Sequence, residues 1–144
     1  MNNRFPLTVA LQPTPEQAAT LTQLARLSES AQLAVQHASI NEGSTDTLIL
    51  ALEDGRMTSG EAVAWLQAQP HLSAAPTFLL AAALRHVAEQ RQRYGDRSAD
   101  TLPIRPLRRI WFAGAQSGPG ALWIDAPSSE GTGWQLVLDL GDGL

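Results

Sequence analysis

The stretch RFPLTVALQPTPEQAATLTQLARLSESAQLAVQHAS, from Arg4 to Ser39, organises the rest of the chain. Its first part alternates between apolar and other residues over 5–12, the period-2 pattern of a strand, and Pro13 ends that pattern. The residues of the predicted buried face are Phe5, Leu7, Val9 and Leu11. The sequence therefore predicts a strand over residues 5–12 with one face in the core.

A long helix is predicted over residues 15–39. Thr14, Pro15 and Gln17 have the pattern of a capping box, in which the Thr14 hydroxyl accepts from the N–H of Gln17 and the Gln17 side chain reaches back. One stripe of the helix repeats at spacings of four and three residues and is predicted to face the core. Its members are Thr20, Leu24, Leu27, Ala31, Ala34 and Ala38.

The middle of the chain reads as a series of helices. Residues 47–53 fit a short helix or a strand, and we favour the helix because Asp46 can cap its start and Gly55 can follow its end. Thr58 and Glu61 form a second capping box. A further helix is predicted over residues 76–94, with loops over 41–45 and 95–106.

The last third of the chain changes to short β-prone runs at residues 109–112, 121–124 and 135–140, separated by turn sequences at 116–120 and 127–133. The predicted fold class is α+β. A small antiparallel sheet, made of one N-terminal strand and a C-terminal three-strand meander, packs against an inserted helical block. We expect a single domain over residues 1–144, with the strand at 5–12, the helical block at 13–94 and the meander at 107–140.

Composition restricts the functional classes. The chain has 144 residues, a net charge of −4 and no cysteine, which excludes disulfides and thiolate chemistry within it. No run of apolar residues is long enough for a membrane span, and no signal peptide is recognisable. The expected location is the cytoplasm, with no membrane partner.

Catalytic patterns are missing from the sequence. The three histidines are far apart, and no nucleophile, zincin or phosphate-loop motif occurs. Asp139 follows an apolar run and precedes a leucine and a glycine, and we interpret it as a turn residue rather than a metal ligand. We expect no enzymatic activity, no metal and no cofactor.

Arginine is concentrated in one segment. Residues 85–109 contain seven arginines and three acids, and all ten basic residues of the chain are arginines. Guanidinium groups bind phosphate well, and an aromatic ring can stack on a base. The predicted nucleic-acid-binding residues are Arg85, Arg91, Arg93, Arg97, Arg105, Arg108, Arg109 and Trp111.

An ordinary structural interpretation of the same residues stays open. Arg85, Glu89 and Arg93 have the i, i+4 spacing of a solvated helix surface. Trp111 follows Arg109 by two positions in a predicted strand, and the ring of Trp111 can equally be a core residue of that strand.

The stretch from Leu7 to Ala38 resembles the opening of the TnpB family of transposon-encoded RNA-guided nucleases, which are related to type V CRISPR effectors. The resemblance lies in a strand followed by the helix start Pro13-Thr14-Pro15-Glu16-Gln17, and in the order of strand, helices and β meander. It implies the wedge and recognition-lobe part of such a protein without its nuclease domain. Val137–Gly141 also looks like the family's first catalytic Asp motif.

The resemblance and the arginines together predict a non-catalytic binding module that contacts RNA or DNA, with a partner protein or nuclease subunit. The alternative is a protein-interaction or structural subunit, with a homo-oligomer left open and no nucleic-acid ligand. An enzyme of unrecognised class is the third option. Convergent arginines would support the first, an exposed apolar patch the second and a pocket with polar groups the third.

Overall fold

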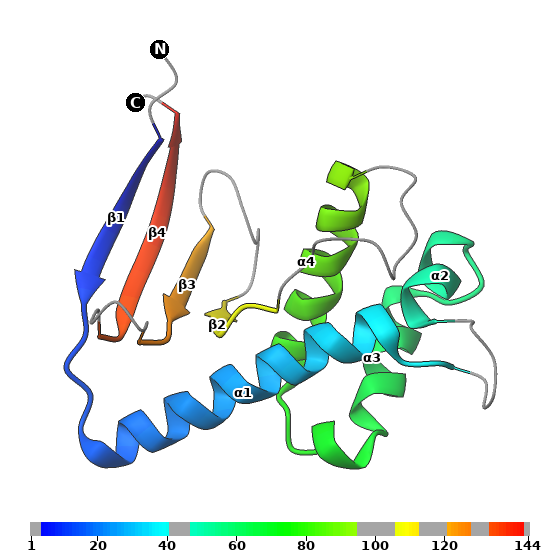
Figure 1. The fold of residues 1–144 in the computed structure, drawn as a ribbon, viewed down its shortest axis with the longest axis horizontal. Helices are drawn as coiled ribbons and strands as arrows, with labels where there is room; N and C mark the ends of the chain where they lie inside the picture. Colours follow the sequence, from blue (N-terminus) through cyan, green and yellow to red (C-terminus); the bar gives the residue numbers. More distant parts are fainter. Residues whose placement is uncertain (1–3, 41–46, 95–105, 113–120, 128–132, 143–144) are drawn as a thin grey trace. The chain divides into compact units, whose positions relative to one another are not determined.

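A computed structural model describes residues 4–40, 47–94, 106–112, 121–127 and 133–142, and the chain divides into two compact units. The sheet unit comprises Met1–Arg26 and Arg108–Leu144, and the helical unit comprises Leu27–Leu107. The elements are β1 (Arg4–Ala10), α1 (Pro15–His37), α2 (Leu48–Glu53), α3 (Ser59–Gln67), the 3-10 turn η1 (Pro70–Leu72), α4 (Thr77–Tyr94), β2 (Arg109–Trp111), β3 (Leu122–Asp125) and β4 (Gln135–Asp142) (Figure 1). The predicted α+β class is confirmed, and the single domain stays a prediction.

The sheet has the strand order β1-β4-β3-β2, with every neighbouring pair antiparallel (Figure 1). The C-terminal meander and the return of β1 to the sheet are therefore both confirmed. β1 ends at Ala10, although the N–H of Leu11 still donates to the carbonyl of Trp134 at 2.8 Å. β1 and β2 lie at the two edges. The predicted loop at 41–45 and most of the loop at 95–106 lie outside the described residues.

Register gives one face of the sheet two neighbouring rows that are wholly apolar. Residues paired across neighbouring strands point to the same side of a sheet, so they form rows. One row reads Val9, Leu136, Ile124, Ile110, and the next reads Leu7, Leu138, Leu122, Phe112. We call these two rows the apolar face.

The prediction that β1 buries one face is wrong at the two positions that decide it. Leu7 is 53% exposed and Val9 is 46% exposed, whereas Ile110, at the other end of a row, is 2% exposed. Alternation identifies side chains that share a face, but it does not determine whether another layer covers that face. Because β1 is an edge strand, its apolar side chains have a strand neighbour on one side only.

The interpretation of Asp139 as a turn residue is also wrong. Asp139 lies inside β4 and is 7% exposed. Its N–H donates to the carbonyl of Ala121 at 2.9 Å, and on the other side it is in register with Pro6 of β1. Pairing on both sides carries β4 on to Asp142, past the glycine that suggested a turn.

Both predicted capping boxes are present. The N–H of Gln17 donates to Thr14 Oγ1 at 3.2 Å, and the N–H of Thr14 donates to Gln17 Oε1 at 3.0 Å. Thr58 and Glu61 make the same reciprocal pair at the start of α3, at 3.1 Å each way. Each box satisfies two of the backbone donors that a helix start leaves without intrahelical partners.

Residues 47–53 form a helix, as favoured, although the N-cap of α2 is Thr47 rather than Asp46. Gly55 follows the helix with φ of +73°, in the left-handed region that glycine adopts at low cost. The N–H of Gly55 donates to Leu52 and the N–H of Arg56 donates to Ala51, which is the Schellman pattern. The sequence thus encodes both ends of this short helix locally.

The core of the helical unit is mainly leucine and alanine. The predicted stripe of α1 is correct in its second half, where Ala31 and Ala34 are buried, and wrong at Thr20, which is exposed. The buried side chains contributed by the other helices include Leu48, Ile49, Ala51, Ala62, Leu66, Leu79, Leu80, Ala82, Ala83, Leu84 and Val87. Small alanine side chains allow helices to approach closely, and α3 and α4 pack against each other extensively.

A buried glutamine of α1 holds the chain where it leaves the helical unit. Gln32 is 1% exposed, and its Nε2 donates to the carbonyl of Leu107 at 2.8 Å. In return, the N–H of Leu107 donates to Gln32 Oε1 at 2.8 Å. Gln32 Nε2 also bonds to Ser28 within α1. One side-chain amide therefore satisfies both backbone groups of Leu107, as a neighbouring strand would.

Candidate functional site

The predicted arginine cluster is distributed over both units. Arg85 and Arg91 lie on α4 in the helical unit, and the backbone of Arg93 belongs to the same helix. Arg108 and Arg109 lie in the sheet unit, where Arg109 begins β2. Arg97 and Arg105 lie outside the described residues. Convergence of the arginines on one face therefore stays a prediction.

Arg91 is engaged in an ion pair within the helical unit. Its Nε donates to Glu53 Oε1, and its Nη2 donates to Glu53 Oε2 at 3.1 Å. This bidentate ion pair joins α4 to α2. The Arg91 side chain is only 11% exposed, whereas Glu53 is 41% exposed. This geometry favours a structural role for Arg91, because its guanidinium charge is already compensated by a carboxylate.

Arg109 is also compensated, although the sequence suggested no acidic partner for it. Its Nε donates to Asp125 Oδ1 at 2.7 Å, across a directly opposed pair of β2 and β3. The guanidinium lies 4.3 Å from the centroid of the Trp123 ring. Trp111 lies on the same face and is fully buried. Its burial fits the interpretation as a core residue of a strand rather than as a ring that stacks on a base.

Arg108 lies in a different environment, which the sequence did not suggest. Together with Arg26 of α1 and the largely buried Trp134, it lines a hollow of about 210 Å³ in the sheet unit. Both arginines are exposed. The lining of the hollow therefore includes two exposed arginines and a tryptophan, and no sequence pattern links Arg26 to Arg108.

The outer edge of β1 has hydrogen-bonding groups directed away from the sheet. The N–H of Leu11 points to β4, and this direction alternates along a strand, so the groups of Val9 and Leu7 also point to β4. The N–H and C=O groups of Thr8 and Ala10 therefore point outward. Pro6 has the same outward parity but no N–H to donate.

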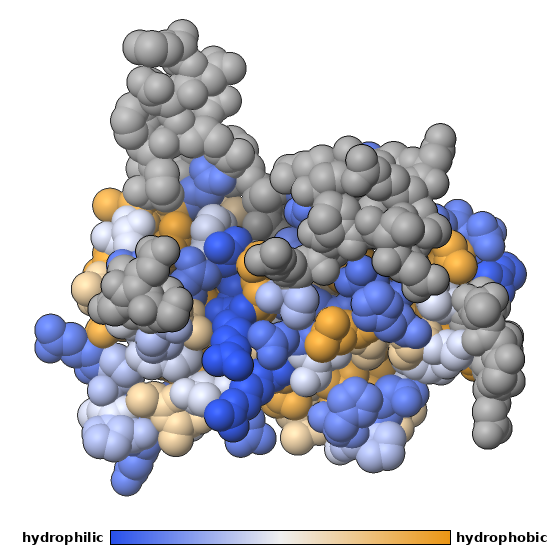
Figure 2. Space-filling model, in the orientation of Figure 1, coloured by the Kyte–Doolittle hydropathy of each residue, from blue (hydrophilic) through white to orange (hydrophobic). Residues whose placement is uncertain are grey.

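That edge is also apolar, and no strand pairs with it in the described part of the chain. Both apolar rows end there, at the exposed side chains of Leu7 and Val9, and Figure 2 shows hydrophobic surface over β1 and β4. Natural sheets usually protect an exposed edge with charges, bulges or prolines. Between Arg4 and Glu16 no residue is charged. In β1, Pro6 and a register irregularity between Arg4 and Pro6 protect the start of the edge, and neither extends to Thr8 or Ala10.

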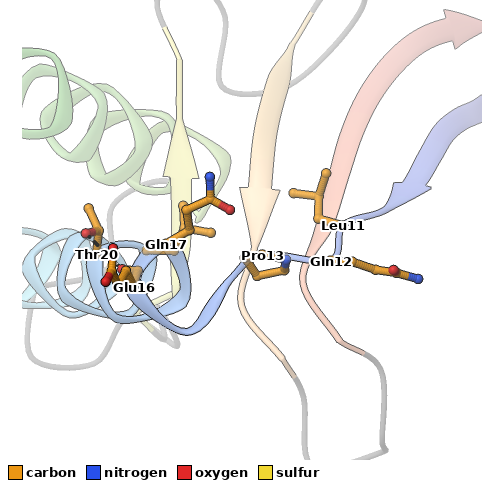
Figure 3. Close-up of a pocket in the computed structure, with 7 residues that line it drawn as sticks. Leu11, Gln12, Pro13, Glu16, Gln17 and Thr20 are labelled. Atoms are coloured by element: carbon orange, nitrogen blue, oxygen red, sulfur yellow. Dashed lines mark hydrogen bonds between the residues drawn. The ribbon is translucent and has the colours of Figure 1, made fainter.

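A groove continues from the end of this edge (Figure 3). It has a volume of about 530 Å³ and lies between the segment that follows β1 and the first turns of α1. In Figure 3, Leu11 and Gln17 rise on the same side of the chain, whereas Gln12 points away from α1. The lining residues are Leu11, Gln12, Pro13, Glu16, Gln17, Thr20 and Leu21.

Within the described residues, no group of three or more histidine, cysteine, aspartate or glutamate side chains is placed to hold a metal ion. None of the helices described here has both the length and the apolar character needed to cross a membrane. Comparison with protein-family models, with curated proteins and with solved structures found no match. The resemblance to the TnpB family therefore stays a prediction.

Proposed function

We propose that this chain is a non-catalytic protein-interaction module that binds an extended apolar strand along the outer edge of β1. The observation that carries this proposal is the exposure of Leu7 and Val9 at the open end of two apolar rows. An extended segment beside β1 would cover both side chains and would pair with the outward groups of Thr8 and Ala10. Strand addition to a sheet edge combines main-chain hydrogen bonds with side-chain pockets, and the groove beside Leu11 supplies such a pocket.

The arginines support this choice indirectly. Arg91 and Arg109 are paired with carboxylates, and Trp111 is buried, so three of the predicted nucleic-acid-binding residues have other roles in the fold. The net charge of −4 also does not favour binding to a polyanion.

A strand-shaped probe tests the proposal. A fluorescent peptide of alternating valine and threonine is titrated into the full chain, with anisotropy as the readout, and we expect saturable binding. Thr8→Pro should abolish it because it removes an outward N–H, while the β1–β4 ladder does not use that group. Phe78→Lys, at an exposed apolar position of α4, is the control and should bind normally. No binding by the wild type, or equal binding by Thr8→Pro, would contradict the proposal.

Nucleic-acid binding is a second candidate function, favoured by the hollow of Arg26 and Arg108. The resemblance to the TnpB family agrees with it. We expect RNA affinity to fall when Arg26→Ala and Arg108→Ala are combined, with the log–log salt slope reduced by roughly 0.7 for each phosphate that the double variant no longer neutralises. Arg56→Ala is the control, since Arg56 pairs with Asp54 on the surface. The absence of RNA binding by the folded protein at low salt would exclude this candidate.

A further inference from the structure

We propose that the strand bound by β1 is β1 of a second copy of this chain, in an antiparallel pair centred on Val9. This inference rests on the proposed function and names the partner. A two-fold axis perpendicular to the sheet at Val9 would join two four-stranded sheets edge to edge into one continuous sheet. Four observations support this arrangement: hydrogen-bond register, continuity of the apolar rows, charge and the position of the groove.

Hydrogen-bond register selects Val9 as the centre. The outward groups of β1 that include both a donor and an acceptor belong to Thr8 and Ala10. Centring on Val9 places Thr8 of each copy opposite Ala10 of the other, so all these donors and acceptors are used. Centring on Thr8 would instead place Ala10 opposite Pro6, which has no N–H, and would leave the Ala10 carbonyl without a donor.

The same register continues both apolar rows into the second copy. Val9 meets Val9 of the second copy, so the row from Ile110 to Val9 extends into its own symmetry mate. Leu7 lies opposite Leu11 of the second copy. Because a two-fold axis perpendicular to the sheet keeps both apolar faces on the same side, the exposed leucine and valine become cross-strand neighbours of apolar residues.

Charge and shape at the ends of the strands agree with this pairing. The residues between Arg4 and Glu16 are uncharged, so the pair brings no like charges together along the strands. Leu7 of one copy also comes next to the groove lined by Leu11, Pro13 and Leu21 of the other.

Cysteine trapping tests the pair directly, because the chain contains no cysteine. In the proposed register Val9 faces its own copy in a non-hydrogen-bonded pair, with Cα atoms about 4.5 Å apart, within disulfide range. With oxidised glutathione present, Val9→Cys should form a covalent dimer. Leu7→Cys is the matched control on the same face, because its two copies would be offset by roughly 13 Å along the strands, too far for a disulfide.

Analytical ultracentrifugation of the wild-type chain measures the same association without a covalent bond. We expect the mean mass to rise from monomer to dimer with concentration, with a dissociation constant on the order of 10 μM, because a strand edge and a groove are smaller than a standard interface. Thr8→Pro and Val9→Lys should each weaken association roughly ten-fold or more, and Phe78→Lys should leave it unchanged. Circular dichroism verifies that every variant is folded.

The outcomes separate this inference from the proposed function. A wild-type chain that stays monomeric, or equal cross-linking of the Leu7→Cys and Val9→Cys variants, overturns the β1 dimer. If the valine–threonine peptide still binds and Thr8→Pro abolishes that binding, the protein-interaction module stands and the partner is another protein. If neither self-association nor peptide binding occurs, both proposals are overturned.

Discussion

Replacing Trp111 with alanine is expected to lower the free energy of unfolding by about 3–5 kcal/mol. Trp111 is fully buried in β2, so alanine would remove most of a large side chain and leave a cavity in the sheet unit. A decrease of this size is a large fraction of the about 5–15 kcal/mol that stabilises a typical domain. Denaturant titration followed by circular dichroism measures it.

Two control variants test the assignment of Trp111 to the core. Trp111→Phe retains most of the apolar volume and should cost much less than alanine. Phe78→Ala removes a ring that is 39% exposed and should also cost less. If Trp111→Ala changed stability by less than about 0.5 kcal/mol, as surface substitutions usually do, the ring would not be a core residue and its role in base stacking would have to be considered again.

The features predicted correctly from sequence depend on residues close together in the chain. Thr14 and Gln17 are three positions apart, as are Thr58 and Glu61, so each capping box can be read from a few letters. Gly55 marks the end of α2 in the same way, because the left-handed conformation is inexpensive for glycine. Short-range rules of this kind correctly predicted the starts of α1 and α3.

The errors concern partners that are distant in sequence. Arg91 meets Glu53 across 38 positions, and Arg109 meets Asp125 only because the register of β2 and β3 places them opposite each other. Leu7 and Val9 alternate correctly, yet the pattern could not show that β1 would be an edge strand. A sequence signal for the edge did exist, since Pro6 has no N–H to donate to a ladder and proline inside a strand occurs mainly on edge strands.

Gln32→Leu is expected to destabilise the helical unit by about 1–3 kcal/mol. Leucine has a similar size but would leave the N–H and the carbonyl of Leu107 without the partner that Gln32 provides. Because Leu107 is half-buried, water can replace part of what these two groups lose. Leu33→Gln, at a 41% exposed neighbouring position of α1, is the matched control and should be nearly neutral. Equal stability of Gln32→Leu and the wild type would show that the hydrogen bonds to Leu107 contribute little.

Gln32→Glu should make the stability of the protein depend on pH, and the direction of that dependence tests the two hydrogen bonds to Leu107. A protonated carboxyl can still donate to the Leu107 carbonyl and accept from its N–H, whereas a carboxylate can only accept and is buried. Burial therefore raises the pKa of the introduced carboxyl above its unfolded value of about 4.3. The stabilising interaction should be present below that value and should disappear as the pH rises through the raised folded-state pKa. Relative to the wild type, the variant should thus be nearly as stable at pH 4 and clearly less stable at pH 7, and an unchanged difference between these pH values would contradict the assigned geometry of Gln32.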